Sequence, residues 1–368
     1  MRFFLDYLEH IFGDIKPPTW AKVSFALGIL LVLIALFPDY AGKVISWLIL
    51  LVTNTAPLWL PFLLATVFWK VWLVYRRAAF LSTQKSVLLE IKLPQDIDKS
   101  PAAMELVILG LFQTGGQSTW YDRQILGRTR AWFSLELVSI EGKVHFYIWT
   151  RDFLKDVVEA AIYSQYPTVE IFEVEDYTLA VPYFDADHIH MFGTQHKYAK
   201  NTAFPIRTYV DFKLDENPKE EYKVDPLASV LEYLAALGPG EQMWIQILIR
   251  AYKEPQIEEH GIFTRFDFYA EGKEELKKLR EEVLKEKSES VEGEEREYLR
   301  IPARGEQERF NAIDRKLSKQ PFECAFRAIY LAKPDDFKGP RIGQMIRIWT
   351  PFNFPALIIG LFESLGVC

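Results

Sequence analysis

Three residues in one short segment have the types and spacing that could bind a metal ion. His188 and His190 are separated by one residue, so in an extended chain both imidazoles point to the same side, and Asp185 precedes them. Zinc and manganese accept such ligands. No cysteine lies nearby and the chain has no second histidine pair, so a polar connector is the simpler interpretation. We expect neither a bound metal nor a cofactor.

Nucleotide chemistry would require a phosphate-binding loop, in which a glycine stands five residues before a Gly-Lys-Ser/Thr sequence. Every Gly-Lys pair of the chain lacks both the earlier glycine and the following hydroxyl residue. These pairs are Gly42-Lys43, Gly142-Lys143 and Gly272-Lys273. No nucleophilic triad or carboxylate pair can be picked out from 50 acidic residues without a motif. The sequence therefore predicts a protein that is not an enzyme.

Aromatic residues on two predicted strands form a candidate surface for a partner. Residues 131–138 and 143–150 alternate apolar and polar side chains around Glu141-Gly142, which predicts a β-hairpin. Aromatic rings exposed on such a sheet stack RNA bases, but Glu136 on the same surface would repel phosphate. Packing of the rings in a buried interface between two tandem sheets is the favoured alternative. The candidate residues are Trp132, Tyr147 and Trp149.

Charge is distributed unevenly along the chain. Residues 1–80 carry seven Lys or Arg and four Asp or Glu, a net charge of +3, so the remainder carries −10 of the total of −7. A basic footprint is the first feature expected of a nucleic-acid-binding protein, and the acidic body lacks one. The best positions for contact with an anionic partner lie in the predicted loop 114–130, at Arg123, Arg128 and Arg130.

The basic N-terminal part reads as a membrane anchor over residues 1–80. Residues 23–37 contain no charge and predict one spanning helix, and residues 57–75 predict a second. Residues 44–52 form either the first turns of a long second span or a short helix in the membrane interface. Residues 1–15 have apolar side chains at helical spacing and predict an amphipathic helix.

Tryptophans and a double arginine mark the membrane boundary of the second span. Tryptophan is enriched at membrane interfaces, and arginine flanks the cytoplasmic end of a span. With two crossings, this predicts a protein of the inner membrane whose N-terminus and body both lie in the cytoplasm. The residues expected at the interface are Trp59, Trp69, Trp72, Arg76 and Arg77.

The body is predicted to be α+β, with two tandem ferredoxin-like (βαββαβ) domains. Residues 81–180 give the complete order β-α-β-β-α-β, including a helix that begins at Ser100-Pro101. Residues 181–204 are a predicted connector. Residues 205–368 repeat the pattern with a first strand at 206–214 and a helix after Asp225-Pro226, and no sixth strand is evident.

The second predicted domain is interrupted by a charged segment. Residues 271–300 contain eleven acidic and eight basic residues with pairs at helical spacing, and a second helix is predicted over 304–320. We interpret residues 271–320 as a helical hairpin in solvent. The alternative is that this hairpin contacts a partner or stabilises a ring of neighbouring subunits.

Several segments of the body resemble the region between the membrane spans and the motor of type IV secretion and conjugation ATPases of the coupling-protein and HerA-like kind. These segments are residues 134–139, 142–148, 158–167, 205–211, 223–226 and 240–246. The resemblance covers about residues 85–355 and implies a RecA-like motor after this region. The chain ends at Cys368, where that motor would begin, so no catalytic residue is carried over.

These observations predict a non-enzymatic, membrane-anchored accessory or assembly subunit of a type IV secretion-like or conjugative DNA-transfer system. We expect it to bind membrane lipid, to self-associate and to act beside a separately encoded ATPase. One alternative is a membrane-tethered nucleic-acid-binding protein. Another is the truncated N-terminal part of a DNA-translocating ATPase.

Overall fold

The computed structural model describes residues 38–94, 99–117, 119–181, 188–198, 202–215, 225–253, 256–257, 265–285, 303–352 and 359–365. The chain forms two compact units, Met1–Tyr75 and Arg76–Cys368. The predicted amphipathic helix (1–15), the predicted span at 23–37 and Asp185 lie outside the described residues.

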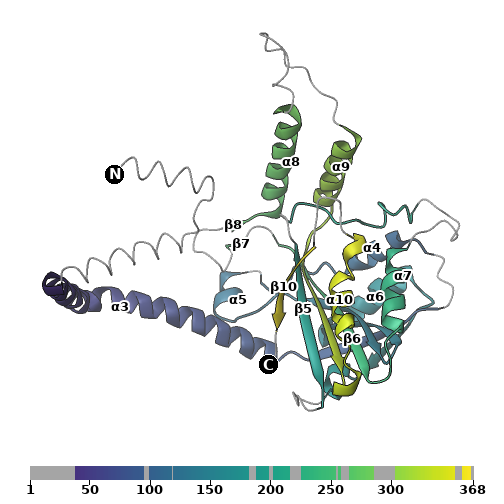
Figure 1. Ribbon diagram of the computed structural model, residues 1–368, viewed down its shortest axis with the longest axis horizontal. Helices are drawn as coiled ribbons and strands as arrows, with labels where there is room; N and C mark the ends of the chain where they lie inside the picture. Colours follow the sequence, from purple (N-terminus) through teal and green to yellow (C-terminus); the bar gives the residue numbers. More distant parts are fainter. Residues whose placement is uncertain are drawn as a thin grey trace, which may run out of the picture. The chain divides into compact units, whose positions relative to one another are not determined.

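The first unit contains most of one long helix, α3 (Pro38–Ser82), which runs through Pro57 and Pro61 (Figure 1). At 1.5 Å per residue its 45 residues extend over roughly 68 Å, about twice the ~30 Å of a bilayer's hydrocarbon core. Residues 44–52 continue directly into the rest of this helix, so they form its early turns. Within α3, the segment Leu50–Ser82 is long and apolar enough to cross a membrane, and none of its most apolar part is buried in the protein.

Hydroxyl groups inside α3 are satisfied by the helix itself. Ser46 donates to the carbonyl of Gly42 at 2.7 Å, and Thr55 donates to that of Leu51 at 2.7 Å. A side chain that bonds to the preceding turn leaves no polar hydrogen without an acceptor, which an apolar solvent would otherwise penalise. These hydroxyl groups are therefore compatible with a hydrocarbon environment.

The second unit is built on one antiparallel sheet of eight described strands in the order β10-β5-β9-β6-β2-β3-β1-β4. The first half of the body supplies β1 (Ser86–Lys92), β2 (Phe133–Ile140), β3 (Lys143–Arg151) and β4 (Glu170–Val174). The second half supplies β5 (His190–Tyr198), β6 (Glu241–Ala251), β9 (Phe322–Ala332) and β10 (Ile359–Leu365). The protein is therefore a mixed α+β structure, as predicted.

The two halves of the sheet have the same strand order and meet at β2 and β6. Counted along the chain within each half, the strands lie in the order fourth, first, third, second from the outer edge to the centre. The second strands pair antiparallel, with Glu136 opposite Gln246 and Leu137 opposite Ile245. The prediction of two separate sheets that enclose an interface was wrong, because β2 and β6 join edge to edge through their backbones.

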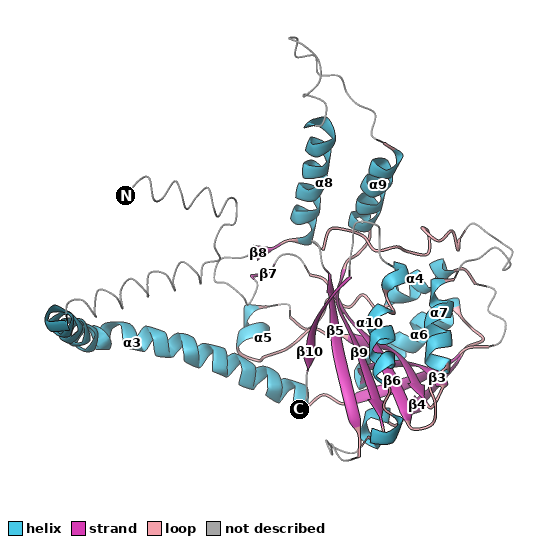
Figure 2. Cartoon of the chain, viewed as in Figure 1, coloured by secondary structure: helices cyan, strands magenta, loops and turns pink. Residues whose placement is uncertain are grey.

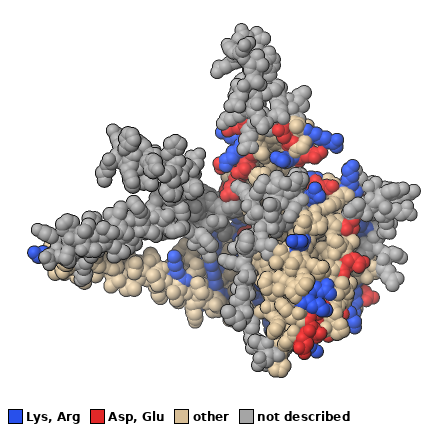
Figure 3. Space-filling model, in the orientation of Figure 1, with Lys and Arg blue, Asp and Glu red and all other residues tan. Residues whose placement is uncertain are grey.

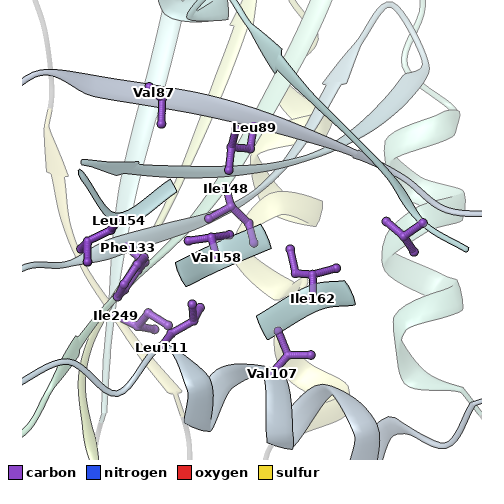
Figure 4. Close-up of a cluster of buried hydrophobic side chains, with 11 residues drawn as sticks. Val87, Leu89, Val107, Leu111, Phe133, Ile148, Leu154, Val158, Ile162 and Ile249 are labelled. Atoms are coloured by element: carbon purple, nitrogen blue, oxygen red, sulfur yellow. The ribbon is translucent and has the colours of Figure 1, made fainter. Parts of the chain in front are cut away.

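Helices cover one face of this sheet (Figure 2). In the first half, α4 (Pro101–Gly110) and α6 (Lys155–Gln165) pack on β1, β2 and β3 through a buried apolar cluster that includes Leu89 and Phe133 (Figure 4). In the second half, α7 (Pro226–Ala235) and α10 (Gly339–Arg347) pack on β6 and β9 around Ile245. Phe133 and Leu137 are four residues apart on β2, so their side chains lie on the same face of the sheet. Phe133 pairs with Ile249 and Leu137 with Ile245 on β6, so the two helix pairs cover the same face.

Local sequence signals explain where several elements begin and turn. Ser100 caps α4 by accepting a hydrogen bond from the Ala102 amide, and Asp225 caps α7 in the same way from Leu227. A proline follows each cap, where its missing N–H is not needed. The predicted β2–β3 hairpin is confirmed, and Glu141 and Gly142 both adopt positive φ angles of 52° and 83° in its turn.

Two strands of the second half were not predicted correctly. The segment predicted as its first strand, 206–214, is a turn in which Asp211 accepts a hydrogen bond from the Thr208 amide at 2.7 Å. The first strand is instead β5, which lies inside the predicted connector 181–204. Its helix-facing positions include Thr194 and His196, so the apolar alternation that identifies a strand is weak. The final strand, β10, pairs with β5.

The predicted helical insertion is present in the second half. Helices α8 (Phe268–Lys285) and α9 (Arg304–Ser318) run side by side away from the sheet, after the two-stranded ribbon of β7 (Gln256–Ile257) and β8 (Arg265–Phe266) (Figure 2). Figure 3 shows acidic and basic side chains mixed on these helices. Pairs at helical spacing are present: Lys278 Nζ lies 2.9 Å from Glu274 Oε1, four residues earlier on α8.

Candidate functional site

The face of the sheet opposite the helices carries the predicted aromatic residues. A short segment after β4, η2 (Tyr177–Ala180), lies over the middle of this face. The Tyr177 ring stacks on Tyr147 with 5.4 Å between centroids and meets the edge of Trp244 at 5.0 Å. All three rings are at least nine-tenths buried. The chain itself therefore covers the centre of the predicted surface.

A buried polar triad lies at the junction of the two halves. The Tyr177 hydroxyl donates to Glu136 Oε2 at 2.5 Å and accepts from Gln246 Nε2 at 2.7 Å. Burial, followed by the Glu136 charge, raises the pKa of Tyr177 far above its ordinary value, so its hydroxyl remains a donor. The triad joins β2, β6 and η2. The sequence identified Glu136 but missed Tyr177 and Gln246, because their meeting depends on the pairing of β2 with β6.

Two predicted aromatic residues remain accessible beside this covered centre. Trp132 and Trp149 stack with 5.7 Å between centroids, and both are half-buried. The Arg151 guanidinium lies over both rings at 4.6 and 5.0 Å, and also donates to the Gln84 carbonyl. The structure brings the three predicted aromatic residues to one face, but the burial of Tyr147 leaves no continuous platform of exposed rings.

The predicted basic contacts have different environments. Arg130 is 2% exposed, donates to Glu323 at 2.7 Å and also bonds to the Ala251 carbonyl. Its proposed contact with an anionic partner was wrong, because its guanidinium joins β6 and β9 in the interior. Arg128 is half-exposed and pairs with Asp122 at 3.1 Å. Arg123 is partly buried on α5 (Trp120–Gln124).

The histidine pair does not form a metal site with other described residues. Nowhere in the described part of the chain do three or more His, Cys, Asp or Glu residues group as metal ligands. His188 and His190 are exposed at the start of β5, and the His190 ring meets the edge of Phe337 at 5.4 Å. His196 is buried farther along the strand. Its burial lowers the pKa of the imidazole, against the opposing effect of the Ile346 backbone.

The second half contains a buried carboxylate that the sequence did not identify. Glu241 is fully buried and accepts hydrogen bonds from the Gly238 amide at 2.7 Å and the Tyr330 hydroxyl at 2.7 Å. Lys338 Nζ lies 3.2 Å away and Arg341 Nε 3.5 Å away. Burial by itself would raise the pKa of Glu241, but these hydrogen bonds and charges lower it below its ordinary value. The arrangement fastens the start of β6 to β9 and to the start of α10.

The predicted membrane-interface residues all lie on α3. Trp59 and Trp69 are about two-fifths exposed, at 41% and 38%, and Trp72 is partly buried. Arg76 and Arg77, the first residues of the second unit, are partly buried. Arg76 Nε donates to the Ile125 carbonyl at 2.9 Å. Arg76 therefore also holds the loop after α5.

Comparisons of the chain with protein-family models, with curated proteins and with solved structures find no match. The prominent features are an apolar helix that the rest of the protein does not cover, a broad sheet with two buried, hydrogen-bonded carboxylates, and a charged hairpin.

Proposed function

We propose that the chain is a non-enzymatic, membrane-anchored assembly subunit of a type IV secretion-like or conjugative DNA-transfer system. The observation that carries the proposal is α3, whose most apolar part has no cover from the rest of the protein. Exposed apolar surface on this scale marks contact with a membrane or a partner. The transfer system is proposed from the resemblance of the body to the pre-motor region of its ATPases.

The anchor enters the inner membrane through α3, and the body lies in the cytoplasm. The segment 44–69 contains no charged residue, and Trp69, Trp72 and Tyr75 precede Arg76 and Arg77. Aromatic rings followed by arginines are typical of the cytoplasmic end of a span. A further crossing at 23–37 would place the N-terminus on the same side.

The body serves as a scaffold made of two ferredoxin-like units that share one sheet. The support is the strand order, which is the same in both halves, together with the paired helices on one face. A sheet that is continuous across both halves of the body gives a broad, rigid platform for neighbouring subunits. A separately encoded ATPase and further copies of this chain are the proposed partners.

Direct nucleic-acid binding receives less support from the geometry. Tyr147 is 8% exposed and Arg130 is 2% exposed, so one predicted stacking residue and one predicted phosphate contact are both interior. Trp132, Trp149 and Arg128 remain for such a contact. A salt titration distinguishes the alternatives, because phosphate contacts weaken steeply as the salt concentration rises. Measurable, salt-dependent binding of DNA or RNA to the full chain would favour the alternative.

The proposal is tested in two steps with the full chain. First, membranes are washed with carbonate, and the wild type is compared with a Leu63→Arg, Leu64→Arg variant on exposed positions of α3. We expect the wild type to remain in the membrane and a smaller fraction of the variant to remain, because only the predicted crossing at 23–37 would still hold it. Leu179→Arg, at a residue 80% exposed on the body, is the matched control and should remain membrane-bound.

Second, the chain is purified from native membranes in mild detergent and the associated proteins are identified. We expect a secretion or transfer ATPase to purify with the wild type. Retention in the membrane without any secretion or transfer component would refute the assembly role while leaving the anchor intact. Loss of the wild type from washed membranes would refute the anchor.

A further inference from the structure

Helix α5 presents two adjacent aromatic side chains to the surroundings. Trp120 is 58% exposed and Tyr121 is 56% exposed. Their helix is short but firmly held, because Thr119 and Asp122 form a reciprocal capping box with hydrogen bonds of 3.1 and 3.2 Å. Arg128 also pairs with Asp122 at 3.1 Å. The rings are therefore displayed on an ordered support.

This support is attached to the residues where the apolar helix ends. Arg76 Nε donates to the Ile125 carbonyl, one residue after α5, at 2.9 Å. Gly127 has a φ of +66°, and a side chain there would approach the Arg76 carbonyl carbon to 2.5 Å. Backbone therefore lies directly against backbone at this point. Arg76 directly follows Tyr75 in the chain, so the anchor proposed above would bring the segment bonded to Arg76 near the lipid headgroups.

The chemistry around α5 matches that level of a membrane. Trp and Tyr prefer the interface, where the ring is in an apolar region and the polar group is hydrated. The end of α3 and the loop around α5 together carry four arginines and one carboxylate, that of Asp122. Arg128 is half-exposed, and the other three, Arg76, Arg77 and Arg123, are partly buried. Guanidinium groups bind phosphate through paired hydrogen bonds, so an anionic bilayer fits this surface by charge as well as by polarity.

We propose that α5 is a second membrane contact, in which Trp120 and Tyr121 enter the interfacial layer of an anionic bilayer beside the point where α3 leaves it. The half-exposed Arg128 faces lipid phosphates, and the partly buried Arg76, Arg77 and Arg123 add positive charge beside it. This inference rests on the proposed membrane anchor. It adds an orientation to it, because a single helix leaves the body free to rotate whereas a second contact fixes which side of the sheet faces the membrane.

Site-directed fluorescence in vesicles tests the proposal with the full chain. Cys324→Ser and Cys368→Ser remove the native thiols, and a single cysteine carries a polarity-sensitive dye at Tyr121→Cys, Phe62→Cys or Tyr269→Cys. Phe62, 76% exposed on α3, reports the span, and Tyr269, 36% exposed on α8, is the aromatic control. The vesicles contain phosphatidylcholine and phosphatidylglycerol, with and without lipids that carry a doxyl quencher.

We expect a blue-shifted emission and a loss of fluorescence to doxyl lipid at positions 62 and 121, and neither change at 269. In vesicles of phosphatidylcholine alone, quenching at 121 should weaken while quenching at 62 is unchanged. Quenching at 62 without quenching at 121 overturns the α5 contact and leaves the anchor in place. Protection of 121 from aqueous iodide without lipid quenching also overturns it, because a protein then covers the site. Absence of quenching at both positions overturns the anchor as well.

Discussion

The two halves of the sheet share a strand order but differ in how their central hairpins close. In the first half, Glu141 and Gly142 alone join β2 to β3. In the second half, residues 252–321 intervene between β6 and β9. These two strands nevertheless form eleven residue pairs without a break in register. The first pair is Glu241 with Ala332, and the last is Ala251 with Phe322. The insertion begins where the ladder ends. The cost of loop closure grows only slowly with length, so such an insertion is tolerated if the ladder is kept.

The halves also differ in how they fasten their buried polar groups. The first half uses Glu136, which accepts from the Tyr177 hydroxyl, and that hydroxyl in turn accepts from the Gln246 amide. The second half uses Glu241, which faces Lys338 and Arg341 in addition to Tyr330. A carboxylate bonded by neutral groups depends less on its charge than one that faces cations. The two halves therefore have equivalent topology and unequal electrostatics.

The largest effect is expected from cavities in the two apolar clusters. Leu89→Ala in the first half and Ile245→Ala in the second should each lower the free energy of unfolding by about 2–5 kcal/mol, because both side chains are almost fully buried. Denaturant titration of the full chain in detergent, followed by near-UV circular dichroism, measures this. Leu106→Ala, at a residue 55% exposed on α4, is the control and should change stability by less than about 0.5 kcal/mol.

The shape of that transition tests whether the halves unfold together. A shared sheet predicts that either cavity shifts one common transition. Two separate transitions, each sensitive to only one of the substitutions, would show that the halves are independent despite the β2–β6 ladder.

Substitution of the two buried carboxylates should lower stability by different amounts in the two halves. Glu241→Gln removes the charge that faces Lys338 and Arg341, and we expect it to lower the free energy of unfolding by about 2–3 kcal/mol. Glu136→Gln keeps an oxygen that accepts from Tyr177, and we expect a loss of about 1 kcal/mol or less. Both are measured in the same denaturant titration. An equal loss in the two variants would contradict the electrostatic difference between the halves.

The pH dependence of stability gives a second measurement of the same difference. The pKa of Glu241 is lower in the folded protein than its ordinary value, so its ionised form favours folding. This contribution to stability is complete at pH values above the ordinary carboxyl pKa. It is lost as the pH falls below that value and through the lowered pKa of Glu241 in the folded protein. The wild type should lose stability in this acidic range more steeply than Glu241→Gln. Parallel pH profiles would contradict the assignment.

The turn of the first half should tolerate substitution less well than the insertion of the second. Gly142 has a φ of +83°, and a side chain there would approach the Leu237 carbonyl oxygen to 2.7 Å. We expect Gly142→Ala to lower the melting temperature, with a loss of at least about 1 kcal/mol. Gly305 on α9 has open space around it, so Gly305→Ala should raise stability by about 0.5 kcal/mol. A stability change of the same sign in both variants would contradict this contrast between the turn and the insertion.

Local signals in the sequence were sufficient to locate most of the first half and the insertion. The cap at Ser100, the alternation in β2 and β3 and the charged spacing in α8 each act within a few residues, so they are visible without the fold. Strand β5 was missed because its buried positions include Thr194 and His196. It is held by pairing with β9 and β10, which are distant in the chain.

The sequence predicted which aromatic residues lie on the candidate surface but not which of them are exposed. The sequence placed Tyr147 and Trp149 on one face, and the structure agrees. Whether a ring is exposed depends on what lies above it, and the segment around Tyr177 follows β4 without a pattern that indicates where it packs. Arg130 was misjudged for the same reason. Its partner Glu323 lies on β9, and no local signal connects the two positions.

The smallest effect is expected where the insertion meets the first half. Lys319, directly after α9, pairs with Glu105 of α4 at 2.7 Å, and Tyr209 donates to the same carboxylate at 2.9 Å. Both charged groups are about one-third or more exposed, so Lys319→Ala should lower stability by less than about 1 kcal/mol, and by less still at high salt. A double-mutant cycle with Glu105→Gln isolates the pair. A coupling energy near zero at low salt would mean that the insertion is attached to the sheet only through its own strands, whereas a measurable coupling makes it a brace between the two halves.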